Sequence, residues 1–260
     1  MQRAAGTPPL TGFIVSLLVC GFLLHLSLTK TALGLLTCVQ LAPGRSYLLG
    51  DLDIACTQDE WGALAAVGTT ALVAYGLGIP LGSLALLWSH RKQLQRAAVK
   101  ARYGFLYMQY KPGAWYWESV TLMRKVGLAV IAVLLAPQGT GVQVMCSISL
   151  LVGSLLLHLM ARPHVDERLN ALEACSLVVA VGTLAGGAVL VDEAAPPGWR
   201  HVTSVAIVLL NAAFIAAAVG ALGWFALHDA SLRAAASATV RHARRRLQSV
   251  VKRSASVAAR

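Results

Sequence analysis

Five charged side chains stand within or beside apolar stretches, and they are the residues in this sequence best placed to do chemistry. They are Glu118, Arg124, Lys125, Arg162 and Glu173, with Arg168 nearby. A charge in such a stretch is costly unless it reaches water, meets a partner or faces a wet cavity. Glu118 and Lys125 are seven residues apart and share one face of a helix. We expect a buried charge network in which Glu173 pairs with Arg124 or Lys125, with ordinary snorkelling to water as the alternative.

No catalytic or metal-binding motif accompanies these charges. The sequence contains no G-x-S-x-G, H-E-x-x-H or Walker loop and no C-x-x-C pair, and its seven histidines are dispersed. We therefore expect no enzymatic activity, no cofactor and no bound metal.

The composition is typical of a protein that lies in a membrane. The chain is 57% hydrophobic and only 13% charged, whereas a soluble domain carries roughly 25% charged residues. The apolar residues also fall in long blocks rather than in amphipathic stripes. We expect an all-α, polytopic membrane helical bundle, integral and multi-pass.

Six apolar runs within residues 1–228 predict six membrane-spanning helices, over residues 9–28, 61–88, 117–136, 141–161, 171–191 and 202–227. A signal peptide is the competing interpretation of the first run, but the run is long and lacks a small-x-small cleavage site. Basic residues gather in segment 89–111 and in a tail, 229–260. By the positive-inside rule both termini are then cytosolic.

Two prolines are expected to bend or end helices. Pro80 lies inside the second run, where it kinks the helix or frees a carbonyl. Pro112, followed by glycine, separates the basic segment from the third run. Trp and Tyr rings suit the boundary between hydrocarbon and water. We expect the rings around Pro112 to anchor the chain at that boundary: Tyr103, Tyr107, Tyr110, Trp115 and Trp117.

Segment 31–60 is expected to be a solvated outer loop that carries several carboxylates. Cys38 and Cys56 flank its polar part. A disulfide between them would close a loop of about 17 residues and stabilise the fold by about 3 kcal/mol if this side is oxidising. Two free thiols are the alternative.

The tail concentrates basic side chains without a carboxylate from Ala230 onward. They include Arg241, Arg244, Arg245, Arg246, Lys252 and Arg253. Apolar residues recur opposite them at helical spacing, so we expect an amphipathic helix on the anionic inner leaflet. A calmodulin-type partner could also bind it, and a disordered solvated tail is the third interpretation. Orientation and anionic lipid explain the net charge of +11, so no nucleic-acid partner is expected.

Several motifs occur in a familiar order. The outer loop carries Cys38, Ser46-Tyr47-Leu48, Asp51, Ile54 and Cys56. Next come Gly78-Ile79-Pro80 and the basic cluster His90-Arg91-Lys92, which ends the second apolar run. The motif Y-G-F-L-Y-x-x-Y-x-P-x-x-W-Y-W-E then runs from Tyr103 to Glu118. Arg162-Pro163 and N-x-L-E-x-x-S-L from Asn170 to Leu177 complete the pattern. Residues 30 to 190 thus resemble the TRP-like transmembrane region of algal and protist multi-pass proteins.

This resemblance implies a membrane protein related to TRP-type channels, with a cation-channel-like or sensory role. A TRP pore needs a re-entrant helix and a filter between its last two spans. Here only about ten residues, Asp192 to His201, separate the fifth and sixth runs. A shared pore would therefore require a homo-oligomer. The alternative is a non-conducting anchor or scaffold that binds anionic lipid or a cytosolic partner, and an integral-membrane enzyme or transporter is a third, weaker one.

Overall fold

The computed structural model describes residues 9–42, 45–56, 58–224 and 227. The chain divides into two units, Met1–Ile207 and Val208–Arg260. The second begins within the last described helix, Pro197–Trp224. The expected tail from residue 229, with its arginines and lysines, lies outside the described residues.

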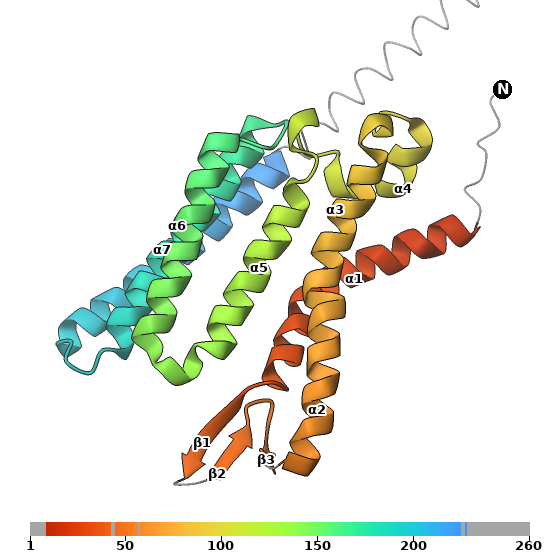
Figure 1. The fold of residues 1–260 in the computed structure, drawn as a ribbon. Coiled ribbons are helices and arrows are strands. Elements are labelled where there is room, and N and C mark those ends of the chain that lie inside the picture. Colours follow the sequence, from red (N-terminus) through yellow and green to blue (C-terminus); the bar gives the residue numbers. More distant parts are fainter. Residues whose placement is uncertain (1–8, 43–44, 57, 225–226, 228–260) are drawn as a thin grey trace, which may run out of the picture. The chain divides into compact units, whose positions relative to one another are not determined.

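Helices dominate the described residues (Figure 1). The long helices are α1 (Pro9–Gly34), α2 (Gln58–Ala71), α3 (Gly78–His90), α4 (Ala97–Tyr107), α5 (Trp117–Leu134), α6 (Thr140–Ala161) and α7 (Glu167–Val191). Single turns of 3₁₀-helix lie at Arg91–Gln93, Pro112–Ala114 and Ala136–Gln138. α6 packs along α7, and α5 contacts α1, α3 and α6. The predominantly helical fold is the one expected.

Four helices among the described residues are long and apolar enough to cross a membrane. They are Trp61–Gln93, Thr140–Ala161, Glu167–Val191 and Pro197–Trp224, and each overlaps one predicted span. The other two predicted spans correspond to α1 and α5. The apolar helix identified within α1 is shorter, Val19–Gly34. In α5, three charges, Glu118, Arg124 and Lys125, interrupt the apolar run.

The segment between α1 and α2 contains a small β-sheet, which corrects the purely helical expectation. Strands β1 (Cys38–Ala42), β2 (Arg45–Leu48) and β3 (Asp51–Ala55) form an antiparallel sheet in the order β1-β2-β3. Alternating apolar and polar residues such as D-L-D-I are typical of a strand, and they account for β3. Cys38 and Cys56 are joined by a disulfide that closes the sheet.

The second predicted span contains an irregular turn just before Pro80. Residues Leu72–Leu77 form a π-helix between α2 and α3, and the N–H of Gly78 donates to the carbonyl of Val73, five residues back. Pro80 has no N–H and cannot donate to the carbonyl four residues earlier. The irregularity at this proline thus takes the form of a widened turn, which keeps the helix continuous.

A glycine is required where α5 turns into α6. After Leu134 the chain makes a 3₁₀ turn that contains Pro137, and Gly139 then adopts φ +95°. A side chain at this φ would be strained, so Gly139 permits the tight return of the chain. The reversal brings α6 against α5.

Candidate functional site

Two loops meet beside the start of α5, and we call their contact the junction. It comprises the segment between α4 and α5, residues 108–116, and the loop between α6 and α7, residues 162–166. The backbone N–H of Lys111 donates to the carbonyl of Pro163 at 2.7 Å, and the N–H of Val165 donates to that of Gln109 at 3.0 Å. The two bonds bracket an antiparallel bridge between Tyr110 and His164. The junction therefore ties α5 to both α6 and α7.

Buried rings fill the space behind this bridge. The rings of Tyr110 and His164 lie 4.9 Å apart, and His158 lies 6.0 Å from His164 and 6.1 Å from Trp117. His158 is only 1% exposed. Burial lowers the pKa of His164, and the neighbouring His158 lowers it further. The imidazole of His164 is therefore neutral at pH 7, and the cluster packs as an aromatic core.

Asn170 holds the α6–α7 loop in place. Its side-chain oxygen accepts from the backbone N–H of His164 at 3.0 Å, while its amide nitrogen donates to the carbonyl of the same residue at 3.2 Å. The amide nitrogen also lies 3.1 Å from a carboxylate oxygen of Glu167. Asp166 caps α7 by accepting from the N–H of Arg168. A buried amide with its partners satisfied specifies one loop geometry.

Two ion pairs join the elements on either side of the junction. Arg124 on α5 donates to the carboxylate of Glu173 on α7, and these side chains are only 15% and 27% exposed. Lys111 lies 3.1 Å from Glu167 at the start of α7. The second pair is more exposed, so it contributes little to stability. The Arg124–Glu173 pair is the strong polar link between α5 and α7.

The remaining members of the predicted network do not join this pair. Glu118 accepts from the Tyr110 hydroxyl at 2.8 Å and from the Gln109 amide at 3.3 Å, not from Lys125. Lys125 is exposed and forms no ion pair with any residue that the structure describes. Arg162 is exposed and ends α6 in a left-handed conformation with φ +40°. The predicted network is thus one ion pair and a separate carboxylate–phenol contact.

The aromatic anchors divide into two groups. Tyr107, Tyr110 and Trp117 are buried against protein, so their rings leave little surface for contact with lipid. The Tyr107 hydroxyl donates to the carbonyl of Leu94 at 2.6 Å, and the Tyr110 hydroxyl donates to Glu118. Tyr103 and Trp115 are half-buried and keep a surface that can meet the boundary. Pro112 begins the 3₁₀ turn before α5, where a helix break was expected.

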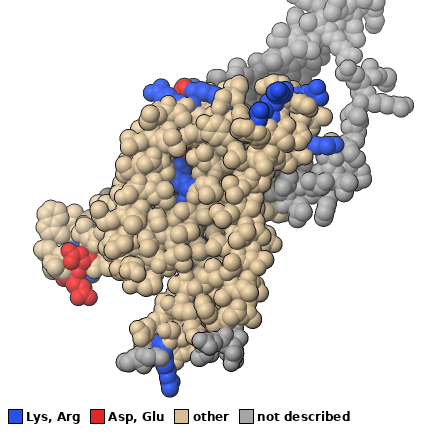
Figure 2. All heavy atoms as spheres, viewed as in Figure 1, with Lys and Arg blue, Asp and Glu red and all other residues tan. Residues whose placement is uncertain are grey.

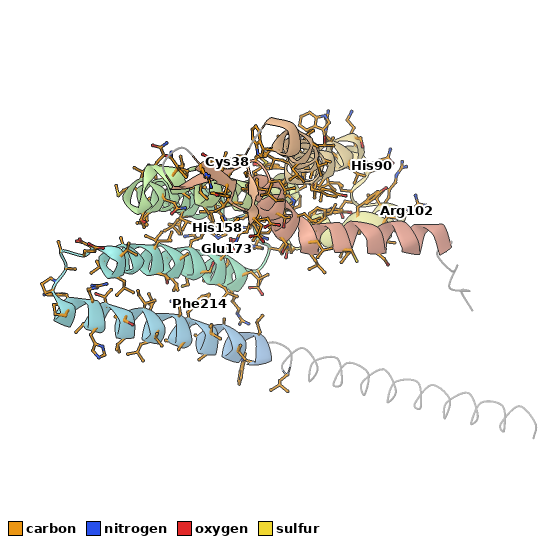
Figure 3. The ribbon with its side chains drawn as sticks, turned by 90° about the horizontal axis from the view of Figure 1, so that it is seen from below. Cys38, His90, Arg102, His158, Glu173 and Phe214 are labelled. Carbon is orange, nitrogen blue, oxygen red and sulfur yellow. A yellow bond between two sulfur atoms is a disulfide. The ribbon has the colours of Figure 1, made fainter. Side chains whose placement is uncertain are left out.

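His158, His164 and Asn170 were not predicted as site residues. Figure 3 shows His158 and Glu173 in one region of the bundle, apart from His90 on α3 and Arg102 on α4. Each of these polar residues lies within or beside an apolar run of the sequence. A polar side chain in such a place needs a hydrogen-bond partner, and this need is the feature that could have marked them. The spacing of residues in the sequence does not predict the ring contact between His158 and His164. That contact depends on how the chain turns after Ala161.

The Tyr110 hydroxyl tests the junction directly. Burial raises the pKa of Tyr110 well above its usual value, and the Glu118 carboxylate raises it further, so the phenol stays protonated and donates. Tyr110→Phe is expected to lower the free energy of unfolding by about 1.5–3 kcal/mol, because it removes a hydrogen bond to a charged group. Chemical unfolding of the chain in mixed micelles measures the change.

Tyr103→Phe is the matched control, since Tyr103 is half-buried and its hydroxyl forms no hydrogen bond with a described residue. It should leave the free energy of unfolding within about 0.5 kcal/mol of wild type. Equal effects of the two substitutions would show that the Tyr110–Glu118 bond does not stabilise the junction.

The contacts of the junction are structural ones between two loops. The described residues include no group of three His, Cys, Asp or Glu side chains that could hold a metal ion. The junction consists of backbone hydrogen bonds, a polar loop and packed aromatic rings, and the shielded Arg124–Glu173 ion pair lies beside it. These contacts join the segment before α5 to the loop between α6 and α7.

The four apolar helices long enough to cross a membrane define a helical membrane protein. The model of the transient receptor potential (TRP) ion channel family matches residues 90–247, more than half of the chain. The chain belongs to this family, which confirms the resemblance seen in the motifs. The match includes the junction and the Arg124–Glu173 pair.

One similar protein is cysteine repeat modular protein A of Toxoplasma gondii. It is 32% identical over 178 residues, which are 63% of this chain and 6% of that protein. The chain thus spans only a small part of the length of this relative. No solved structure matches the chain.

Proposed function

We propose that the chain is the membrane domain of a TRP-type cation channel or sensor, and that the junction transmits movement to its helices. The observation that carries the proposal is the Arg124–Glu173 ion pair, which lies within the family match and joins α5 to α7. A shielded pair of this kind between two apolar helices is typical of functional sites in membranes. The family membership supports the channel or sensor class.

The proposed topology has six spans: α1, α2 with α3, α5, α6, α7 and Pro197–Trp224. Most of the Lys and Arg side chains visible in Figure 2 lie near the upper end of the view, with others midway and at the opposite end, and this excess supports placing the upper end at the cytosolic leaflet. Both termini then lie in the cytosol. We also propose anionic inner-leaflet lipid or a calmodulin-type protein as partners of the tail.

Conduction in this proposal requires a homo-oligomer. α7 ends at Val191 and the next helix begins at Pro197, so the connection between them is too short for a re-entrant pore helix. A pore would therefore form between the helices of several chains.

Current through planar bilayers tests the proposal, with the purified oligomer of defined mass reconstituted as wild type and as Arg124→Gln. We expect a cation current whose gating changes in the variant, because the link between α5 and α7 is lost. Lys125→Gln removes the neighbouring cation, which has no ion-pair partner among the described residues, and should leave gating unchanged. A folded oligomer that passes no current would contradict the channel function.

The second candidate is a non-conducting anchor or scaffold. The short connection between α7 and the last helix favours it, since a single bundle then has no pore element. In that case the basic segments hold anionic lipid or a cytosolic partner. Absence of current together with binding to anionic vesicles would support this candidate.

A further inference from the structure

A histidine on α1 is buried in the bundle without a hydrogen-bond partner. His25 is only 1% exposed, and neither of its ring nitrogens forms a hydrogen bond of ordinary geometry with a described residue. A neutral imidazole carries one N–H donor and one acceptor nitrogen. A buried donor that finds no acceptor destabilises a fold, so a polar side chain in this place indicates a contact that the bundle needs.

His25 lies at the level of the π-helix Leu72–Leu77, which we call the π turn. A Cβ added at Gly21 would lie 3.8 Å from Ile79, and one added at Gly76 would lie 3.6 Å from Thr29. His25 is four residues from both Gly21 and Thr29, so the three share one face of α1. This face therefore packs along the π turn, with His25 in its middle.

Pro80 leaves one carbonyl of the π turn without its helical donor. Proline has no N–H, and an α-helical bond from position 80 would end at Gly76, four residues back. Bonds in the π turn reach one residue further, as the bond from Gly78 to Val73 does, and this spacing from position 80 ends at Tyr75. An acceptor without a helical donor is thus expected at Tyr75 or Gly76.

The imidazole of His25 lies beside the backbone of Tyr75. We propose that His25 donates a hydrogen bond to the Tyr75 carbonyl, in place of the N–H that Pro80 lacks, and that this bond controls a hinge at the π turn. In the structure the two groups are adjacent without the bond, so the hinge is in its open form. A small rotation of the ring or of the turn forms the bond and fixes α3 relative to α2.

The packing around the π turn leaves α3 room to move. A cavity of about 610 Å³ lies between α1 and the second predicted span, and Gly78 and Gly82 of α3 line it. A Cβ added at Gly82 would meet no atom within 4 Å. Proline residues and π turns are the places at which helices bend. A bend at this turn would therefore carry α3 into space that no side chain of the described residues fills.

Movement at the hinge changes a polar contact between α3 and α5. The Ser83 hydroxyl donates to the carbonyl of Pro80 at 2.8 Å and lies 3.0 Å from the Ser119 hydroxyl on α5. Both serines are buried. The hinge is thus connected to the helix that carries Arg124, although it lies outside the junction. It stands whether or not the bundle conducts ions.

A double-mutant cycle tests whether His25 serves the carbonyl that Pro80 leaves free. The full chain is unfolded with denaturant in lipid nanodiscs as wild type, His25→Leu, Pro80→Ala and the double variant. In the wild-type background His25→Leu should raise the unfolding equilibrium constant about tenfold or more, because a buried carbonyl is left unpaired. In the Pro80→Ala background the restored N–H serves the carbonyl, and His25→Leu should have less than about a threefold effect.

Equal effects of His25→Leu in the two backgrounds would overturn the proposal, since the ring would then act independently of Pro80. Folding of His25→Leu only in the Pro80→Ala background would support it. If His25→Leu folds in neither background, the ring is needed for packing alone and the proposal is wrong. His25→Gln is the matched variant: it keeps an N–H donor and should remain within about threefold of wild type. A loss as large as that of His25→Leu would contradict the donor role.

Spin labels on either side of the π turn test the hinge itself. Val67→Cys on α2 and Ala85→Cys on α3 place the labels at exposed positions. The free cysteines are replaced by serine in this chain: Cys20, Cys146 and Cys175. Pulsed electron paramagnetic resonance in nanodiscs then gives the distribution of distances between the two labels.

The two substitutions should change this distribution in opposite directions. We expect a narrower distribution in Pro80→Ala, which restores a regular helix, and a broader one in His25→Leu, which removes the bond that fixes α3. His25→Gln should match wild type. Identical distributions in wild type, His25→Leu and Pro80→Ala would show a rigid turn and would overturn the hinge.

Discussion

Arg124→Gln is expected to lower the free energy of unfolding by about 3–5 kcal/mol, because it leaves the shielded Glu173 carboxylate without its counter-charge. Glu173→Gln should have an effect of similar size, since it strands the guanidinium of Arg124 in the same place. The protein alone shields both side chains from most of the surrounding solvent. The double variant should be closer to wild type than either single variant, because no charge is then left unpaired.

Wild type, Arg124→Gln, Glu173→Gln and the double variant are unfolded with denaturant in lipid nanodiscs and followed by circular dichroism. The four free energies of unfolding give the coupling energy between Arg124 and Glu173. Lys125→Gln is the matched control: it removes a cation from the next position of α5, and this cation is exposed and forms no ion pair with a described residue. It should change the free energy of unfolding by less than about 0.5 kcal/mol. Additive effects of Arg124→Gln and Glu173→Gln would contradict a direct contact between them.

Removal of the Cys38–Cys56 disulfide is expected to lower the free energy of unfolding of the β1–β3 sheet by about 3 kcal/mol. The bridge spans a sequence separation of 18 residues, and its loss frees that loop in the unfolded chain. The sheet has only three short strands and no large core of its own. Hydrogen exchange of the strand amides, measured for Cys38→Ser/Cys56→Ser, reports the local loss.

Cys146→Ser is the control, because Cys146 is a free cysteine on α6. It should leave the exchange of the strand amides unchanged. Reduction of the wild-type chain should reproduce the effect of the double substitution. If the strand amides remain equally protected after reduction, the sheet is held by its hydrogen bonds and packing, and the proposed contribution of the bridge is wrong.

The sequence by itself determined the class of the protein and the approximate positions of its helices. Long apolar runs can satisfy their backbone polar groups in a membrane only by forming helices, and the four apolar helices overlap four of the predicted runs. The sequence was also sufficient to recognise the family, because the order of residues in the motif from Tyr103 to Glu118 is specific. Pro112 marked the end of one element and the start of the next because proline cannot continue a helix.

The tertiary structure alone decided which polar residues meet. Arg124 and Lys125 are adjacent and equal in charge, and only the rotation of α5 against α7 selects Arg124 for Glu173. The same packing turns Tyr110 and Trp117 inward, although their composition suited the membrane boundary. Local patterns report which groups need partners, but contacts between distant segments depend on how whole helices pack, and so the junction emerged only from the fold.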